Sequence, residues 1–345
     1  MKKVVLAFSG GLDTSYCAIY LAKEMGLEVH AALANTGGFS AEELARIEKR
    51  AYALGVKSYV ALDVTQDYYQ HAIKYMIFGN VLKNSTYPIS VSSERISQAT
   101  AIARYAREIG AYYLCHGSTG AGNDQVRFDM IFNIVAPEIE VIALIREKRL
   151  SREEEIEYLR SHGVDFDFKK AEYSINQGIW GTSVGGKETL TSSETLPEEA
   201  YPSQLKETEP RRVTLTFERG EFVALDGKRY DDRIAAIQAL QAVASRYAVG
   251  RDMHVGDTII GIKGRVGFEA AAPMVIIKAH HMLEKHTLTK WQLFWKDQIS
   301  AFYGNHLHEG QYYDQVMRDM EAMLESSQRT VSGDVYVDLH PYRFV

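Results

Sequence analysis

The chain has 345 residues, of which 46% are hydrophobic and 24% are charged, and its formal net charge is −6 at pH 7. This length predicts two domains, each large enough to bury its own core. The mild acidity argues against a large nucleic-acid-binding face, because neutralising phosphates requires clustered Lys and Arg.

The sequence carries no signal that predicts export or a membrane span. It has no run of 18 apolar residues, and the apolar run at residues 4–8 is too short for the core of a signal peptide. Two cysteines, Cys17 and Cys115, are too few for a disulfide framework and lie in no metal-binding spacing. We therefore expect a cytoplasmic protein with two buried thiols and no membrane partner.

Strand-like and helix-like segments alternate over the first half of the chain. The strand-like segments are residues 4–8, 29–34, 59–64, 112–115 and 141–145. The helix-like segments are residues 13–25, 40–54 (opened by a capping box at Ser40), 66–78 and 94–109. Such alternation predicts an α/β domain, in which a parallel sheet is covered by helices on both faces and binds ligands at the carboxyl ends of its strands.

The pattern changes near residue 165, so we predict a nucleotide-binding domain at residues 1–165 and a substrate-binding and oligomerisation domain at residues 166–345. Residues 213–217 and 222–225 resemble the two strands of a hairpin. The other expected elements are a strand at 258–263, a strand at 335–339, and helices at 232–247, 273–288, 290–303 and 312–327. The second domain is therefore expected to be α+β.

The string Ser9-Gly10-Gly11-Leu12-Asp13-Thr14-Ser15 lies between the first strand and the first helix. Two glycines let the backbone turn sharply and bring N–H groups close to an anion, and the helix N-terminus adds its positive dipole end. The alternative is a purely structural role, as a simple turn with an Asp N-cap. The string is not a Walker A loop, because the chain contains no GxxxxGK[ST] pattern.

This string resembles the SGGxDS loop of the N-type ATP pyrophosphatases. In that superfamily the loop grips the pyrophosphate part of ATP, and cleavage falls between the α and β phosphates. The resemblance therefore implies adenylation of a substrate rather than transfer of the terminal phosphoryl group.

A second polar string runs from His116 to Asp129, directly after the strand that ends at Cys115. We expect a loop that recognises a zwitterion, in which Arg127 grips a carboxylate with two donors and Asp124 accepts from an amine. A glycine-rich turn with an Asx motif is the competing interpretation of the same residues.

Together the two strings resemble the argininosuccinate synthase family, which carries AFSGGLDTS and, downstream, HGxTGxGNDQVRF. Supporting matches are Ala34-Asn35, residues 87–95, residues 173–183, Gly261-Ile262-Lys263 and Arg265. The resemblance implies a ligase of arginine biosynthesis with citrulline and aspartate as substrates. The ureido oxygen of citrulline attacks the α-phosphorus of ATP, which gives a citrullyl-adenylate and pyrophosphate, and the aspartate amine then displaces AMP.

The resemblance also implies a set of site residues and cofactors. ATP and Mg²⁺ are the expected cofactors, with no metal-binding cluster supplied by the protein. Catalytic roles are implied for Asp13, Asp124 and Arg127. Contacts with ATP are implied for Ala7, Phe8, Ser9, Gly10, Gly11, Leu12, Asp13, Thr14, Ser15, Ala34, Cys115, His116 and Gly117, with Ala34 beneath the adenine. Contacts with aspartate are implied for Thr119, Asn123 and Asp124. Contacts with citrulline are implied for Tyr87, Ser92, Asn123, Arg127, Ser174 and Ser183, and at two departures from the pattern for Asp257 and Phe268.

Two of these residues have a structural alternative, because a Tyr-Pro turn at Tyr87 and a helix-capping Ser92 would look the same in the sequence. Departures from the family pattern are Val91 for Thr, the pair Gly256-Asp257 for Glu-Asn, and Phe268 for Tyr. Two hypotheses follow for the acceptor. Asp257 takes over the contact with the citrulline ammonium, or the pocket suits an N-acylated citrulline.

Other functions stay open from the residues. A related adenylating enzyme with another acceptor would need reactive cysteines and a basic surface for tRNA, or a glutaminase domain for ammonia, and neither is recognisable. A silent nucleotide sensor is a further alternative. The chain stops at Val345 without the C-terminal arm common in the family, and we expect a homo-oligomer, dimer or tetramer, formed through helices 273–288 and 312–327.

Overall fold

The computed structural model describes residues 1–120, 122–164 and 173–345. The chain folds into two compact units. The first contains the described parts of Met1–Val64, Glu94–Glu172 and Thr258–Ile260, and the second contains Thr65–Ser93, Tyr173–Asp257 and Gly261–Val345. The boundary expected between residues 165 and 166 lies outside the described residues, and so that division stays a prediction.

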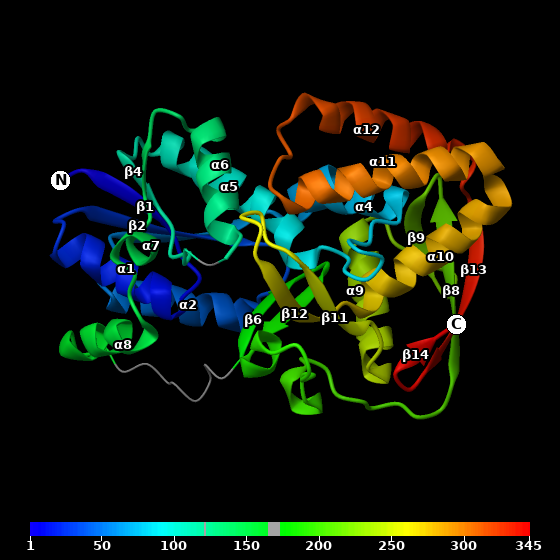
Figure 1. Cartoon of the computed structure of the whole chain (residues 1–345), viewed down its shortest axis with the longest axis horizontal. Helices are drawn as coiled ribbons and strands as arrows, with labels where there is room; N and C mark the ends of the chain where they lie inside the picture. The colour runs from blue at the N-terminus through cyan, green and yellow to red at the C-terminus, as the bar shows by residue number, and fades with distance from the viewer. Residues whose placement is uncertain (121, 165–172) are drawn as a thin grey trace. The chain divides into compact units, whose positions relative to one another are not determined.

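The first unit is built on a five-stranded parallel sheet in the order β3-β2-β1-β4-β5 (Figure 1). The strands are β1 Lys3–Ala7, β2 Glu28–Asn35, β3 Ser58–Asp63, β4 Tyr113–Cys115 and β5 Glu140–Ile142. This confirms the predicted α/β class. The strand order runs outward in opposite directions from β1 and β4, and the crevice at such a reversal is where ligands bind in open α/β sheets.

Helices join the strands of the first unit. They are α1 Leu12–Lys23, α2 Ala41–Ala53, α5 Ser90–Glu108, α6 Asp124–Val135, α7 Leu144–Lys148 and α8 Arg152–Ser161, with residues 90–93 of α5 belonging to the second unit. Ser40 opens α2 with the predicted capping box, in which Glu43 returns a hydrogen bond to the Ser40 backbone. The expected strand at 141–145 is wrong beyond Ile142, because α7 begins at Leu144.

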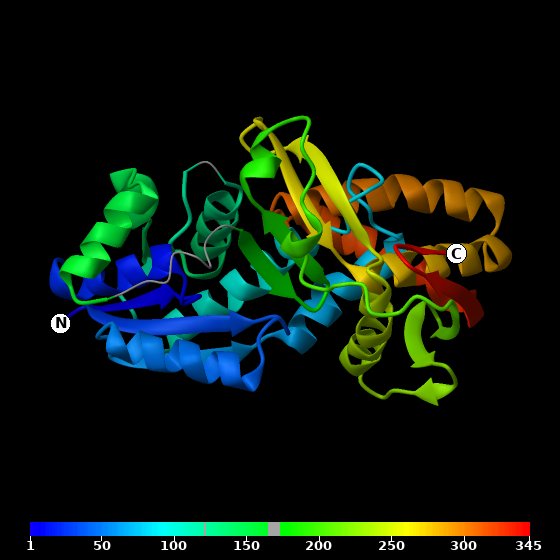
Figure 2. The ribbon, with the colours of Figure 1, turned by 90° about the horizontal axis from the view of Figure 1, so that it is seen from below.

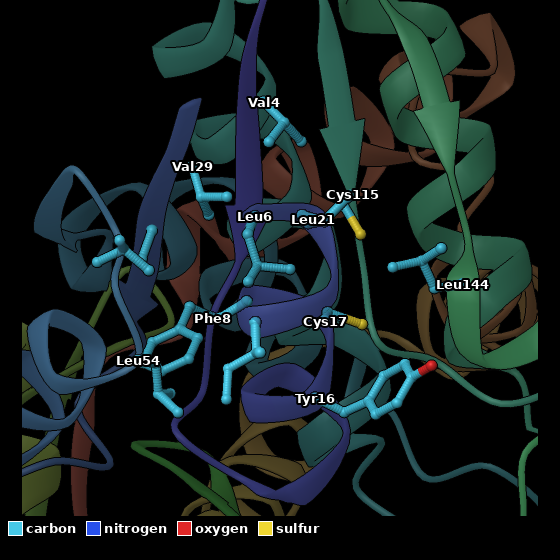
Figure 3. Close-up of a cluster of buried hydrophobic side chains, with 14 of the residues drawn as sticks. Val4, Leu6, Phe8, Tyr16, Cys17, Leu21, Val29, Leu54, Cys115 and Leu144 are labelled. Carbon is cyan, nitrogen blue, oxygen red and sulfur yellow. The ribbon is translucent and has the colours of Figure 1, made fainter. Parts of the chain in front are cut away.

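The core of the first unit lies between the sheet and the helices that pack on it. Figure 3 shows side chains of β1 and α1 meeting there, and both cysteines are buried in this cluster as free thiols, as predicted. The residues labelled in the figure are Val4, Leu6, Phe8, Tyr16, Cys17, Leu21, Val29, Leu54, Cys115 and Leu144.

The second unit contains two antiparallel sheets, ordered β10-β9-β8-β13-β14 and β11-β12-β7-β6. The first comprises β8 Arg211–Glu218, β9 Glu221–Leu225, β10 Lys228–Arg229, β13 Gly333–His340 and β14 Arg343–Phe344. The second comprises β6 Ser174–Gly178, β7 Gly181–Gly185, β11 Arg251–Asp257 and β12 Lys263–Glu269. The predicted hairpin (β8 and β9) and the predicted strand at 335–339 (within β13) are confirmed.

The expected strand at 258–263 is wrong. Residues 258–262 form the turn between β11 and β12, the long hairpin drawn in yellow in Figure 2. Gly261 has φ +83°, a left-handed conformation outside the range of a regular strand that glycine adopts without strain. The apolar residues Ile259, Ile260 and Ile262 suggested a strand, but the strands themselves lie on either side.

The helices of the second unit are α3 Thr65–Tyr68, α4 Lys74–Gly79, α9 Arg233–Ala244, α10 Ala271–Thr287, α11 Lys290–His308 and α12 Gln315–Ser327. A π-turn at Tyr69–Ile73 interrupts the helix that was predicted at 66–78. Short 3₁₀ turns occupy Lys187–Leu190, Glu198–Ala200, Ser245–Tyr247 and Gln328–Thr330. These elements make the unit α+β, as expected. No helix among the described residues is long and apolar enough to cross a membrane.

Candidate active site

The Ser-Gly-Gly string forms the loop between β1 and α1. Gly10 has φ +74°, and a Cβ added there would lie 3.3 Å from the side chain of Ile47. The carbonyl of Gly10 accepts a hydrogen bond of 2.5 Å from Arg50 Nη1, so α2 holds the turn in place. Glycine at this position is therefore required both by the backbone conformation and by the close approach of α2.

The backbone N–H groups at the N-terminus of α1 receive no hydrogen bond from a capping side chain. Its N-cap is Gly11, which has no side-chain cap, so the simple turn with an Asp N-cap is not what forms here. Ser9 and Thr14 share a hydrogen bond of 3.3 Å between their hydroxyl oxygens, and Ser15 Oγ donates to the carbonyl of Gly11 at 2.7 Å. Uncapped backbone N–H groups at a helix start attract an anion such as a phosphate.

A buried carboxyl lies against this loop and was not expected from the sequence. Glu155 of α8 is 2% exposed, and its Oε2 has no hydrogen-bond partner in the part of the chain that the structure describes. Burial and the neighbouring Asp13 raise the pKa of Glu155 to about 8. Burial likewise raises the pKa of Asp13, which lies in the first turn of α1 and is expected to act in catalysis. Because the two carboxyls are neighbours, a negative charge on one opposes ionisation of the other.

The second string follows β4, but only part of it is loop. The described residues from His116 to Asn123 precede the helix, and α6 begins at Asp124, so the expectation of a loop through Asp129 is wrong. Asp124 suits this position, because an acidic residue in the first turn complements the helix dipole. Asp124 and Arg127 therefore project from a helix, which fixes their directions more firmly than a loop would.

His116 anchors the connection between β4 and α6. Its Nδ1 accepts a hydrogen bond of 3.2 Å from Ser118 N, so Nε2 carries the proton and donates to Asp129 Oδ1 at 2.9 Å. Arg146 Nη1 donates to the other oxygen of Asp129 at 2.5 Å. The buried imidazole thus ties the start of the loop to α6 and α7.

The two loops are in contact through Gly117. A Cβ added at Gly117 would lie 3.2 Å from Asp13 Cβ and 3.2 Å from Thr14 Cγ2. The structure therefore brings together the two strings that the sequence singled out, at the carboxyl ends of β1 and β4. A larger residue at Gly117 would push the loops apart.

Asp124 is held by two arginines. Its Oδ1 accepts from Arg127 Nη1 at 2.7 Å and its Oδ2 accepts from Arg95 Nε at 2.9 Å. Burial pushes its pKa upward, but Arg95 and Arg127 outweigh burial and lower the pKa to about 2. The carboxylate can therefore hold an ammonium group at neutral pH, but it is too weak a base to take a proton from one.

The other residues expected on the aspartate and adenine sides also lie in the first unit. Asn123 Oδ1 accepts from Ile259 N at 2.8 Å, and Thr119 is exposed on the loop. Ala34 is buried near the end of β2, and its carbonyl accepts from Gln98 Nε2 at 3.4 Å. Arg95 and Gln98 of α5 were missed as individual residues, because only the fold brings them to these groups.

Three of the residues expected to contact citrulline gather in the second unit. The ring of Tyr87 lies 5.4 Å from that of Phe268 and stacks on His254 at 5.1 Å. Phe268 pairs with Ser183 across β12 and β7. The Tyr87 hydroxyl accepts from Val91 N at 3.2 Å, so this side chain also supports the start of α5.

Ser92 and Ser174 occupy different surroundings in the same unit. Ser92 is buried, its Oγ donates to the Ile89 carbonyl at 3.3 Å, and it lies 3.0 Å from His308 Nδ1. Ser92 is the third residue of α5 and donates to a carbonyl, so it does not cap the helix, and its contact with citrulline stays a prediction. Ser174 is exposed at the start of β6.

The departures at Gly256, Asp257 and Phe268 are separated along one hairpin. Asp257 pairs with Lys263 at one end, where the two side chains form an exposed ion pair of 2.6 Å, whereas Phe268 pairs with Asp252. Five register positions, or about 17 Å, lie between them. A Cβ at Gly256 would lie 2.5 Å from His254 Nε2, so the imidazole fills the space that a side chain at 256 would need.

This arrangement is that of a nucleotide-binding protein in which an α/β unit, with a phosphate loop after its central strand, is joined in one chain to an α+β unit. The family described as arginosuccinate synthase N-terminal HUP domain matches residues 3–165, and the arginosuccinate synthase C-terminal domain matches residues 173–344. The chain belongs to the argininosuccinate synthase family.

Curated relatives cover nearly the whole chain. Argininosuccinate synthase of Xanthomonas campestris pv. campestris is 38% identical over 98% of this chain and 86% of that protein. The enzyme of Dictyoglomus thermophilum is 35% identical over 99% of this chain and 86% of its own length. That of Methanocaldococcus jannaschii is 33% identical over 97% and 85%, respectively.

Proposed function

We propose that this protein ligates citrulline and aspartate to argininosuccinate and cleaves ATP to AMP and pyrophosphate, a step of arginine biosynthesis. The observation that carries the proposal is the contact between the phosphate loop after β1 and the Gly117 connection after β4. The family membership supports it over the alternatives of another acceptor or a silent nucleotide sensor.

In the first step the ureido oxygen of citrulline attacks the α-phosphorus of ATP, and the bond to the β-phosphate oxygen breaks. The leaving pyrophosphate would be held by the backbone N–H groups around Gly10 and Gly11 and by the open N-terminus of α1. Arg127 would hold the citrulline carboxylate in this proposal. The protein's contribution is then orientation and charge stabilisation rather than covalent catalysis.

Mg²⁺ belongs to the same proposal. The described residues contain no group of three His, Cys, Asp or Glu side chains that could hold a metal. Mg²⁺ commonly binds through substrate phosphates, water and one or two carboxylates, so it needs no such group. In this proposal the carboxylate is that of Asp13. When bound it would neutralise the charge that develops on pyrophosphate.

In the second step the neutral α-amine of aspartate attacks the activated carbon of the adenylate, and the C–O bond to AMP breaks, so AMP departs with the ureido oxygen. The proton that the nitrogen loses passes to the departing AMP phosphate or to water. Asp124 would accept a hydrogen bond from the amine and orient it, with Thr119 and Asn123 completing the contacts to aspartate. Because its pKa is about 2, Asp124 orients the nucleophile without removing its proton.

We also propose a cytoplasmic homo-oligomer, and the second unit offers a surface for assembly. Four large aromatic side chains of α11 are between 57% and 68% exposed, namely Trp291, Phe294, Trp295 and Phe302. Most apolar residues of α10 and several of α12 are buried in the core, so α11 supports assembly better than the helices first expected. Light scattering of the wild type and of Trp295→Glu tests this, and a concentration-independent monomer mass for the wild type would exclude it.

The test of the reaction is pyrophosphate release from ATP with citrulline, in the presence and absence of aspartate. We expect citrulline-dependent pyrophosphate release, and AMP and argininosuccinate only when aspartate is added. N-acetylcitrulline serves as a second acceptor, because Gly256 and Phe268 depart from the family pattern. Failure of citrulline to support turnover under all conditions would overturn the proposal.

A further inference from the structure

A chain of alternating charges runs through the first unit from the loop after β2 to the first turn of α6. Thr36 Oγ1 donates to Glu94 Oε2 at 2.7 Å, and Glu94 Oε1 accepts from Arg95 Nη1 at 2.9 Å. Arg95 Nε donates to Asp124 Oδ2 at 2.9 Å, and Asp124 Oδ1 accepts from Arg127 at 2.7 Å. Each carboxylate in the chain is thus held by an arginine.

The middle of this chain is enclosed. Glu94 is 2% exposed and Arg95 is 8% exposed. Burial raises the pKa of Glu94, and the Arg95 guanidinium opposes that rise. Ion pairs in such surroundings are weakly screened by salt. Removing Arg95 would therefore destabilise both Glu94 and Asp124, which share its positive charge.

A second branch of the chain ends on the adenine side. Arg95 Nη1 also donates to Gln98 Oε1 at 2.8 Å, and Gln98 Nε2 reaches the carbonyl of Ala34 at 3.4 Å. One planar guanidinium therefore contacts groups that hold the Ala34–Thr36 segment and the carboxylate that orients Arg127. The several donors of arginine in fixed directions allow this, whereas the point charge of lysine would not.

We infer that Arg95 is a positioning residue that couples the adenine end of the ATP site to the amino-acid end, through Glu94 and Gln98 on one side and Asp124 on the other. This inference rests on the proposed function. ATP bound against the Ala34–Thr36 segment fixes Gln98 and Glu94, which hold Arg95 in the orientation that aligns Asp124. Aspartate therefore binds more tightly when ATP is present, and by linkage ATP binds more tightly when aspartate is present.

The first test changes the charge. In Arg95→Gln, Asp124 loses one of two cations, so its pKa rises toward the ordinary carboxyl range. We expect the acid limb of kcat/KM for aspartate to lie at higher pH in Arg95→Gln than in the wild type, and Arg95→Lys to restore part of that shift. Arg107→Gln is the matched control, since Arg107 lies on the same helix in an exposed ion pair with Glu138. Its profile should match the wild type.

The second test removes only the adenine branch. Gln98→Met keeps Arg95 and Asp124 but loses the contact with the Ala34 carbonyl. Aspartate binding is measured by calorimetry on the full chain, with and without α,β-methylene-ATP. We expect the analogue to tighten aspartate binding about fivefold or more in the wild type and to leave it nearly unchanged in Gln98→Met, whose acid limb stays where the wild type has it.

The outcomes separate this inference from the proposed function. A wild type that releases no citrulline-dependent pyrophosphate contradicts the function itself. If the wild type is active, the coupling is overturned by an unshifted acid limb in folded Arg95→Gln, or by an undiminished effect of the analogue in Gln98→Met. Thermal melting establishes that each variant is folded, and Arg95→Lys supplies the charge-bearing variant where Arg95→Gln melts early.

Discussion

Both units bury charged side chains, but they do so in different ways. In the second unit Lys296 and Glu284 are both fully buried, and Lys296 Nζ lies 3.0 Å from Glu284 Oε2. The same carboxylate accepts from Asn80 Nδ2 at 2.5 Å and from Gln328 Nε2 at 2.8 Å, while Lys296 also donates to the Phe78 carbonyl. This cluster joins α4, α10, α11 and the 3₁₀ turn at Gln328.

The charged cluster of the first unit is open at one end. The side chain of Asp124 is 35% exposed, although Arg95 and Arg127 beside it are almost buried. It also lies next to the connection after β4, whereas the Lys296 cluster is enclosed among α4, α10, α11 and the 3₁₀ turn at Gln328. The comparison teaches that burial of charge does not by itself mark a site. In a binding site at least one charged side chain stays partly exposed to a ligand, and the site lies beside the loops at the carboxyl ends of parallel strands.

The sharpest way to break this comparison is Lys296→Met. Glu284 would then be a buried charge without its cation, and we expect the free energy of unfolding to fall by about 3–5 kcal/mol. Urea denaturation measures the loss, and KM values for all three substrates should stay unchanged below the unfolding transition. The double variant Lys296→Met/Glu284→Gln should recover more than half of the loss. A single variant within about 1 kcal/mol of the wild type would contradict the role of the pair.

Gly10→Val should have the opposite effect: a large loss of activity with a small loss of stability. A β-branched side chain at φ +74°, pressed against Ile47, distorts the phosphate loop, so turnover should fall about 10²–10³-fold. The free energy of unfolding should fall by only about 1–2 kcal/mol. The matched control is Gly26→Val, because Gly26 has φ +63° with no atom within 4 Å of its Cβ position. Equal activity losses in the two variants would show that strain, rather than the loop, is responsible.

Much of the fold could be predicted, because strands and helices of the first unit carry clear apolar periods. The predicted hairpin at 213–225 and the capping box at Ser40 were confirmed for the same reason: local chemistry specifies them. The strand expected at 258–263 was wrong because three isoleucines outweighed Gly261 in the pattern. The start of α6 was missed because the glycines before Asn123 obscured the helical spacing that follows.

The candidate site could be predicted only where its residues form a continuous string. Loops after β1 and β4 were found from their glycines, hydroxyls and charges. Glu155 was not found, since it lies among three consecutive glutamates in a helix that reads as exposed. One signal was available: Glu155 is four residues before Leu159, and both are buried, as helical spacing places them on one face. Arg95 could be identified only from its contact with Asp124 in the folded structure.

A smaller effect is expected for Arg127→Lys, which keeps the charge but loses the planar fork. KM for citrulline should rise about 10- to 150-fold, as for loss of a charge-assisted hydrogen bond, with little change in KM for ATP. Steady-state kinetics with each substrate varied in turn measures this. The control is Arg212→Lys, because Arg212 makes an exposed fork with both oxygens of Asp338. A change confined to the ATP dependence would mean that the role of Arg127 is misassigned.

The last prediction concerns Glu155, a buried carboxyl whose pKa is raised by burial and by the neighbouring Asp13. Its pKa in the folded protein is raised to about 8 from an ordinary value of 4.5, so the folded state binds this proton more tightly than the unfolded state. The resulting stabilisation is fully present below about pH 4.5 and is lost as the pH rises through 8.

We therefore expect the free energy of unfolding of the ligand-free protein to fall between pH 4.5 and 8, with a contribution from this proton of at most about 1.4 kcal/mol per pH unit. Glu155→Gln cannot ionise, and it should flatten that part of the pH profile. The groups that face Glu155 are Asp13, Tyr16 and Cys17 of α1 and Arg152 of its own helix, so Asp13 alone can mimic the effect in this window. Urea titrations of Glu155→Gln and Asp13→Asn at half-unit pH steps separate the two carboxyls. An unchanged slope in Glu155→Gln, together with a flattened slope in Asp13→Asn, would assign the shared proton to the phosphate loop instead.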